Sequence, residues 1–191
     1  MSANIAADEA VTLDGLFRER VRRSPDAVAY CDFSQQHMNW RDYTWSQIDF
    51  QVGRWQAALE RDGLKAGDRV ALMLRNSPEW VIFDQAALGL GLIVVPLYTQ
   101  DRPDNVAYIL NDAGCKVLLL GTREQWTSFA GVQDQLAGLV RVLTVEALTL
   151  EAPAERADAR LRSIDQWLPE SGGETRHVPR DPGALATVVY T

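Results

Sequence analysis

Apolar runs alternate with helix-forming segments through the middle of this chain. The runs recur about every 24 residues between residues 69 and 145, as expected when helices connect successive strands. They are Arg69–Leu74, Ile93–Tyr98, Lys116–Leu120 and Val140–Val145. Because these runs are almost continuously apolar, they are typical of parallel strands buried on both faces. The sequence therefore predicts an α/β fold: a doubly wound, mostly parallel sheet with right-handed crossovers and flanking helices.

Helix start and stop signals support this pattern. Ser77-Pro78-Glu79 combines an N-cap residue, a proline suited to the first helical position and an acid near the positive helix end. Thr44 and Gln47 have the spacing of a capping box. Thr122 is expected to cap a further helix, and Gly63 and Gly114 are suited to end the helices that precede them.

The N-terminal part is expected to place a helix and a β-hairpin before the sheet. Residues 1–11 show no periodicity, and we expect them to be flexible. Leu13, Leu16, Phe17 and Val21 recur at helical spacing, so residues 12–23 are predicted to be a helix. The hairpin would pair residues 27–31 with residues 39–43 across a polar turn.

The last forty residues or so give weaker signals. Residues 151–160 suggest a surface excursion, and Ser163–Leu168 suggests one or two helical turns. Pro169–Pro182 is polar and rich in Gly and Pro, so a mobile loop is expected there. Ala184–Tyr190 is apolar and β-branched enough to predict a final strand.

Charge and hydrophobicity exclude several classes of protein. The formal net charge is −7, and no basic face that would neutralise nucleic-acid phosphates is visible. The N-terminus lacks the basic and apolar regions of a signal peptide. The most apolar stretch, from Ala86 to Tyr98, is shorter than the roughly 20 residues that a membrane-spanning helix needs. We expect a soluble, cytoplasmic protein without a transmembrane segment.

No residues in the chain suggest a catalytic centre or a metal site. Gly89-Leu90-Gly91 follows a helix, whereas a dinucleotide-binding glycine motif follows a strand. Cys31 and Cys115 are interpreted as small buried hydrophobes, and His37 and His177 as exposed loop residues. The tryptophans, including Trp45, Trp55 and Trp80, are interpreted mainly as packing residues, with Trp45 joining a helix start to the hairpin. We predict no catalytic residue and no metal ligand.

Several segments, taken in order, resemble the adenylate-forming (AMP-binding) enzymes, and within them the long-chain fatty acyl-CoA synthetases. Gln47 stands where Glu is frequent in that family, and Thr99-Gln100 stands where Pro-Thr is frequent. The resemblance covers roughly residues 12–191. Its segments are Tyr43-Thr44-Trp45, the run from Gly63 to Ala71, Asn76-Ser77-Pro78-Glu79-Trp80, the run from Ala87 to Tyr98, and Asp181-Pro182 followed by residues 186–191.

The resemblance implies a function and a division of the chain. Residues 12–191 would be the first subdomain of an adenylate-forming fold, ending where the family's phosphate-binding loop begins. The whole enzyme would use ATP, Mg²⁺ and CoA to convert a fatty acid to its acyl-adenylate and then to its CoA thioester. Thr191, at the border of that loop, is the one nucleotide-binding position that can be assigned. The remaining subdomains would be its partners, and the fragment would be inactive alone.

Two other functions stay open at this point. The first is a fragment of an amino-acid or aryl-acid adenylation domain, because residues that choose the acid are mostly not included. The second is a non-enzymatic α/β module that binds a partner through an exposed edge. If the chain is a fragment, it would expose apolar surface where the next subdomain packs, and this surface would favour self-association.

Overall fold

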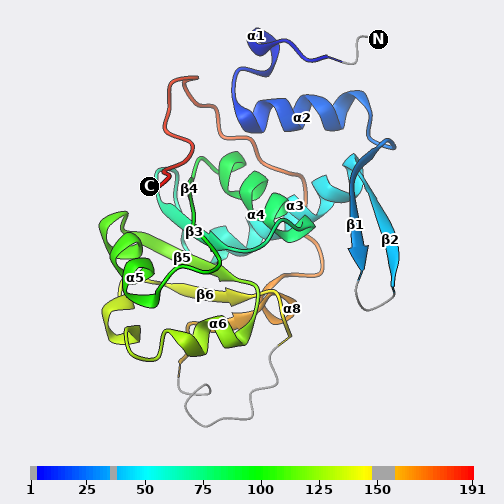
Figure 1. Ribbon diagram of the computed structural model, residues 1–191. Coiled ribbons are helices and arrows are strands. Elements are labelled where there is room, and N and C mark those ends of the chain that lie inside the picture. The colour runs from blue at the N-terminus through cyan, green and yellow to red at the C-terminus, as the bar shows by residue number, and fades with distance from the viewer. Residues whose placement is uncertain (1–3, 35–37, 148–157) are drawn as a thin grey trace.

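The computed structural model describes residues 4–34, 38–147 and 158–191, in which a hairpin and a five-stranded sheet are flanked by helices (Figure 1). The helices are α1 (Ala7–Ala10), α2 (Leu13–Arg23), α3 (Trp45–Arg61), α4 (Pro78–Gly89), α5 (Pro103–Asp112), α6 (Arg123–Ser128), the 3-10 helix η1 (Gln133–Leu136) and α8 (Ile164–Trp167). The strands are β1 (Val28–Ser34), β2 (Asn39–Thr44), β3 (Arg69–Met73), β4 (Ile93–Pro96), β5 (Cys115–Leu120), β6 (Arg141–Thr144) and β7 (Leu161–Ser163).

The main sheet has the order β4-β3-β5-β6-β7 within the described residues, and its neighbouring strands are parallel. The chain passes from β3 to β4 on one side and then crosses to β5 on the other side of β3. The strand order therefore reverses between β3 and β5, which confirms the predicted doubly wound sheet. The antiparallel β1–β2 hairpin is confirmed as well.

Alternate residues of β3 point to opposite faces of the sheet. Val70 and Leu72 belong to a core formed with α3 and α4, whereas Ala71 and Met73 belong to a core formed with α5, α6 and η1. Each face of the sheet is thus covered by its own helices, so both faces of the strands are buried. This arrangement explains why the strands read as continuously apolar.

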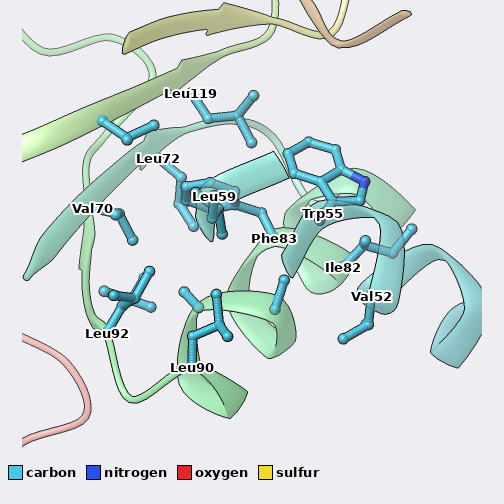
Figure 2. Close-up of a cluster of buried hydrophobic side chains, with 14 of the residues drawn as sticks. Val52, Trp55, Leu59, Val70, Leu72, Ile82, Phe83, Leu90, Leu92 and Leu119 are labelled. Carbon is cyan, nitrogen blue, oxygen red and sulfur yellow. The ribbon is translucent and has the colours of Figure 1, made fainter. Parts of the chain in front are cut away.

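Aromatic rings join distant segments within the α3–α4 core, part of which Figure 2 shows. The Trp55 ring lies edge-on to Phe83 and to Trp167, at centroid distances of 5.6 and 5.5 Å. Trp45, in the first turn of α3, contacts Phe17 of α2 and Tyr30 of β1 at 6.0 and 5.7 Å. The predicted roles of Trp55 in the core and of Trp45 between helix and hairpin are confirmed.

The predicted helix caps are formed. Ser77 accepts a hydrogen bond from the Trp80 backbone N–H, with Pro78 opening α4. The capping box of Thr44 is complete, as is a second one at Thr122. Gly63 and Gly114 have φ values of 84° and 62°, which L side chains rarely adopt.

The predicted strand over Ala184–Tyr190 is wrong in extent. Thr187 makes a single parallel bridge with Val94 at the outer edge of β4. Val94 donates to the Ala186 carbonyl at 3.0 Å and accepts from the Val188 N–H at 2.9 Å. The next donor that a parallel ladder would need is the N–H of Pro96, and proline has none. The pairing therefore stops after one bridge.

Three other details differ from the sequence interpretation. Strand β7 was not predicted, because Leu161–Ser163 is too short to give a pattern. Cys115 is buried as expected, but Cys31 is exposed, since it lies on the hairpin face turned away from Trp45. His177 is half-buried, because its Nδ1 lies 3.4 Å from Asp14 Oδ2.

Several further expectations meet the structure only in part. Helix α8 forms within the predicted Ser163–Leu168 segment. Residues 148–157, which contain most of the expected surface excursion, and His37 lie outside the described residues. Helix α1 forms within residues 1–11, whose flexibility stays a prediction. Over the described ranges, none of the helices has the length and apolar character needed to cross a bilayer.

Candidate functional site

The reversal of strand order defines one position at the edge of the sheet. Ligands of open α/β sheets bind beyond the carboxyl ends of the strands at such a reversal. Here the position lies after β3 and β5, where an open hollow of about 520 Å³ is found. Its lining residues are Met73, Leu74, Arg75, Ser77, Glu79, Thr99, Gln100, Gly121, Thr122, Gln125 and Val145. We call it the switch-point hollow.

The switch-point hollow combines one basic side chain with several hydroxyl groups. Arg75 is exposed and makes no hydrogen bond or ion pair with the residues that the structure describes. Ser77, Thr99 and Thr122 bring hydroxyl groups to the same hollow, and Glu79 adds an acid. A guanidinium group with nearby hydroxyls is suited to a phosphate oxygen or a carboxylate.

Gln125 holds the two loops of the switch-point hollow together. Its Oε1 accepts hydrogen bonds from the backbone N–H groups of Gly121 and Thr122, at 2.8 and 3.1 Å. Its Nε2 donates to the carbonyl of Met73 at 3.3 Å. One amide side chain therefore fixes the end of β5 against the end of β3, which sets the shape of the hollow.

A second hollow, of about 600 Å³, adjoins the first and contains the predicted site residue Thr191. Thr99 and Gln100 line both hollows, so the loop after β4 forms the boundary between them. The lining residues of this terminal hollow are Pro96, Leu97, Tyr98, Thr99, Gln100, Asp101, Asn105, Tyr108, Ile109, Tyr190 and Thr191. Thr191 is exposed there.

The last residues are fixed in place against β4 and α5. The Thr187 hydroxyl donates to the Val94 carbonyl at 2.8 Å. The Tyr190 hydroxyl donates to Asp112 Oδ2 at 2.6 Å, and this hydrogen bond raises the pKa of Tyr190 to about 12. These bonds place Thr191 at the carboxyl edge of the sheet, on the same side as the switch-point hollow.

The chemistry of the two hollows suits binding better than it suits metal coordination. Across the part of the chain that the structure describes, no group of three His, Cys, Asp or Glu residues has the arrangement of a metal site. The histidine described, His177, pairs with Asp14 and lines neither hollow.

Sequence reasoning proposed Thr191, whose role stays a prediction, and did not point to Arg75 or Gln125. Arg75 follows directly after the apolar run of β3, and polar residues at that point of a parallel strand are candidates for ligand contact. Gln125 stands three residues after Thr122, which is the spacing of a capping box. Its additional bond to β3 depends on the strand order and has no signal in the sequence.

The strand order defines a doubly wound α/β domain, and comparison with known proteins identifies its family. The AMP-binding enzyme family matches residues 17–191. The chain therefore belongs to the AMP-binding enzymes.

Individual relatives agree with this family. The chain is 30% identical, over 129 residues, to the long-chain-fatty-acid–CoA ligase FadD15 of Mycobacterium bovis; the alignment covers 66% of this chain and 21% of the relative. Among solved structures, an anthranilate CoA ligase with bound anthranoyl-AMP matches at a TM-score of 0.79 and 18% identity, covering 96% of this chain and 33% of that one. A Rhodopseudomonas palustris protein described as a long-chain-fatty-acid CoA ligase matches at a TM-score of 0.75 and 20% identity. This match covers 94% of this chain and 41% of that one.

The two structural matches support the fold, because their sequence identities are low. This chain also spans about a fifth of the length of the curated relative, at 21%. Other parts of such enzymes therefore correspond to no residue described above.

Proposed function

We propose that this protein is the N-terminal part of an ATP-dependent long-chain fatty acid–CoA ligase. The observation that carries the proposal is the family match over residues 17–191, together with 30% identity to a relative named as such a ligase. In the reaction, the fatty-acid carboxylate attacks the α-phosphate of ATP and releases pyrophosphate. The CoA thiol then attacks the acyl carbon, forming the thioester and releasing AMP.

The geometry of the carboxyl edge supports a role in holding phosphate-bearing substrates. The switch-point hollow offers the Arg75 guanidinium and three hydroxyl groups, and Thr191 lies in the adjoining hollow. This set suits one phosphate group of ATP or CoA. A triphosphate carries more negative charge than one arginine neutralises, so further contacts would come from the rest of the enzyme.

The division of the chain is part of the same proposal. Residues 12–191 would form the first subdomain, and the remaining subdomains of the same enzyme would cover its carboxyl edge. We infer that residues 1–191 do not complete the reaction alone, because the alignment covers 21% of the length of the relative.

A panel of acids tests this function. The chain, joined to the remainder of its enzyme, is assayed for ATP-dependent pyrophosphate release with palmitate, octanoate, anthranilate and a set of amino acids. Preference for palmitate, followed by thioester formation with CoA, is the expected result. No release with any acid would contradict membership in an active ligase.

An aryl-acid ligase is the second candidate. The same fold occurs in an anthranilate CoA ligase, so the fold does not by itself select the acid. Release of pyrophosphate with anthranilate but not with palmitate would select this alternative. The same assay on residues 1–191 alone should show no release.

A further inference from the structure

A third hollow lies away from the carboxyl edge, between α2, α4 and the hairpin. Its volume is about 360 Å³. Helix α4 separates it from the switch-point hollow: Ser77 and Glu79 at the start of α4 line that hollow, whereas the second half of α4 lines this one. Its lining residues are Leu13, Leu16, Phe17, Arg20, Tyr30, Trp45, Asp84, Gln85 and Leu88. We call it the α2–α4 groove.

The walls of the groove are apolar and aromatic. The ring of Trp45 contacts Phe17 on one side and Tyr30 on the other, so three rings from α2, β1 and α3 form one surface. Leu13 and Leu16 lie at the rim and are 57% and 42% exposed. Exposed leucines beside an aromatic wall offer surface for an apolar group.

The polar part of the groove includes Asp84 and Gln85 of α4, beside Arg20 and Tyr30. Asp84 Oδ2 accepts one hydrogen bond, from Gln85 Nε2 at 3.2 Å. Burial raises the pKa of Asp84 to about 6, and the hydrogen bond from Gln85 only partly offsets this. Gln85 Oε1 is buried and has no partner among the described residues. Because a carboxylate only accepts, Gln85 must turn its amide nitrogen toward Asp84, which leaves its oxygen unpaired.

We propose that the α2–α4 groove is a separate binding site for a small organic ammonium ion with an apolar body. The apolar body would pack on the ring of Trp45 and its aromatic neighbours, and the ammonium group would donate a hydrogen bond to Asp84, which lines the groove. A partly buried carboxylate with one hydrogen bond is costly, and a bound cation offsets that cost. This inference does not depend on the proposed ligase function.

Other occupants suit the groove less well. An apolar anion such as a fatty acid would bring its carboxylate toward Asp84, and a neutral hydrocarbon would give the Asp84 carboxylate no counter-charge. The titratable groups that face the groove are Arg20 of α2, Tyr30 of β1 and Asp84 of α4. Arg20 Nη1 lies 3.4 Å from Ser24 Oγ, and its charge is not among the causes of the shift at Asp84. Arg20 therefore does not serve as the counter-ion of that carboxylate.

Three probes of the same shape test the proposal. Binding of 2-phenylethylamine, 2-phenylethanol and 3-phenylpropionate to the protein is measured at pH 7.5 by isothermal titration calorimetry. Charged hydrogen bonds should make the amine bind at least about tenfold more tightly than the alcohol. The propionate should bind most weakly.

Variants at the rim and at the acceptor locate the site. Leu16→Lys should weaken binding of the amine about threefold and Leu16→Glu should strengthen it by a similar factor, with little change for the alcohol. Asp84→Asn should reduce amine binding to the level of the alcohol. Asp104→Asn, at an exposed acid on α5, is the matched control and should change nothing.

Three results would overturn the proposal. The first is equal or tighter binding of the alcohol or the propionate. The second is no amine binding up to millimolar concentration, and the third is amine binding that responds to neither Leu16 variant. Since Leu16 is exposed, these two variants keep the test decisive even if Asp84→Asn fails to fold.

Discussion

Asp62, at the end of α3, accepts hydrogen bonds from two groups far away in the sequence. Arg141 donates to its two oxygens at 2.8 and 2.9 Å, and Trp167 Nε1 donates to Oδ2 at 2.8 Å. The side chain of Asp62 is 6% exposed and that of Arg141 is 19% exposed. The carboxylate thus ties α3 to β6 and α8 in a largely water-free position.

Replacing Asp62 tests this link. Asp62→Ala leaves a partly buried guanidinium and an indole N–H without an acceptor, so we expect the free energy of unfolding to fall by about 2–4 kcal/mol. Urea denaturation measures the change. Asp104→Ala, at an exposed position, should stay within about 0.5 kcal/mol of the parent protein. Equal effects for both variants would contradict the assigned role of Asp62.

Asp84 should make stability depend on pH in the direction opposite to that of a salt-bridged acid. Its pKa is raised from 3.8 to about 6 by burial. The folded state therefore binds more protons than the unfolded state, and the free energy of unfolding falls as pH rises from about 4 to about 6. We expect the change in the free energy of unfolding caused by Asp84→Asn to be more favourable at pH 7 than at pH 4.5, by on the order of 2 kcal/mol. Urea denaturation of both proteins at both pH values measures this difference. The same effect of the substitution at both pH values would contradict the prediction.

Arg75 provides the residue-scale test of the switch-point hollow. In the complete enzyme, Arg75→Gln should raise KM for ATP or CoA about tenfold, which corresponds to loss of one charged hydrogen bond. KM for the acid should stay nearly unchanged, because the acid carries no phosphate. Arg162→Gln, whose Nη1 donates to the Leu161 carbonyl away from both hollows, serves as the control. Unchanged KM for both nucleotides would remove Arg75 from the site.

At the scale of single elements, the loop from Pro169 to Pro182 is held against α3 by hydrogen bonds from one side chain and not by strand pairing. Gln56 of α3 is 1% exposed, and its Oε1 accepts from the Arg176 N–H at 2.7 Å while its Nε2 donates to the Arg176 carbonyl at 2.9 Å. Gly172 packs so closely on Gly53 that a Cβ at residue 172 would clash with backbone atoms. The loop is therefore bound along α3.

Removing the Gln56 amide should release this loop. Gln56→Leu leaves both backbone groups of Arg176 without partners, so stability should fall by about 2–3 kcal/mol. Limited proteolysis should show faster cleavage between residues 169 and 182. Gln135→Leu, at an exposed position in η1 on the other face of the sheet, is the control. An unchanged cleavage rate in Gln56→Leu would contradict the assigned contact.

Elements with local signals could be predicted, and elements that depend on neighbours could not. The start of α4 follows from Ser77 and Pro78, since a cap uses only adjacent residues. The end of the pairing at Thr187 depends on Pro96, which lies about ninety residues earlier in the chain. β7 forms because β6 offers a free edge, and its three residues carry too little pattern to show this.

At the scale of the whole molecule, apolar side chains remain exposed at the terminal hollow and along the last residues of the chain. Tyr98 and Tyr108 line the hollow and are 72% and 61% exposed, and Leu185 and Val189 are 54% and 58% exposed. The proposed remaining subdomains would cover such a surface. We therefore expect the 191-residue chain to self-associate in a concentration-dependent way.

Light scattering and a hydrophobic dye check this expectation together. The average mass should rise with concentration, and dye fluorescence should fall when Tyr98→Ser and Val189→Ser are combined. The matched control combines Trp40→Ser with Met38→Ser on the hairpin, where exposed apolar residues lie apart from the terminal hollow. A monomer at all concentrations that does not bind the dye would contradict the prediction.

The sequence by itself determined the fold class, the helix caps and the resemblance that led to the family, because these depend on periodicity and on neighbouring residues. It also proposed Thr191 as a binding position, which stays a prediction. Only the tertiary structure decided that β3 and β5 lie side by side, that Arg75 and Gln125 therefore share a hollow with Thr122, and that Asp84 lies in an aromatic groove. Those relations depend on strand order and helix packing, which join residues far apart in the chain and leave no local pattern.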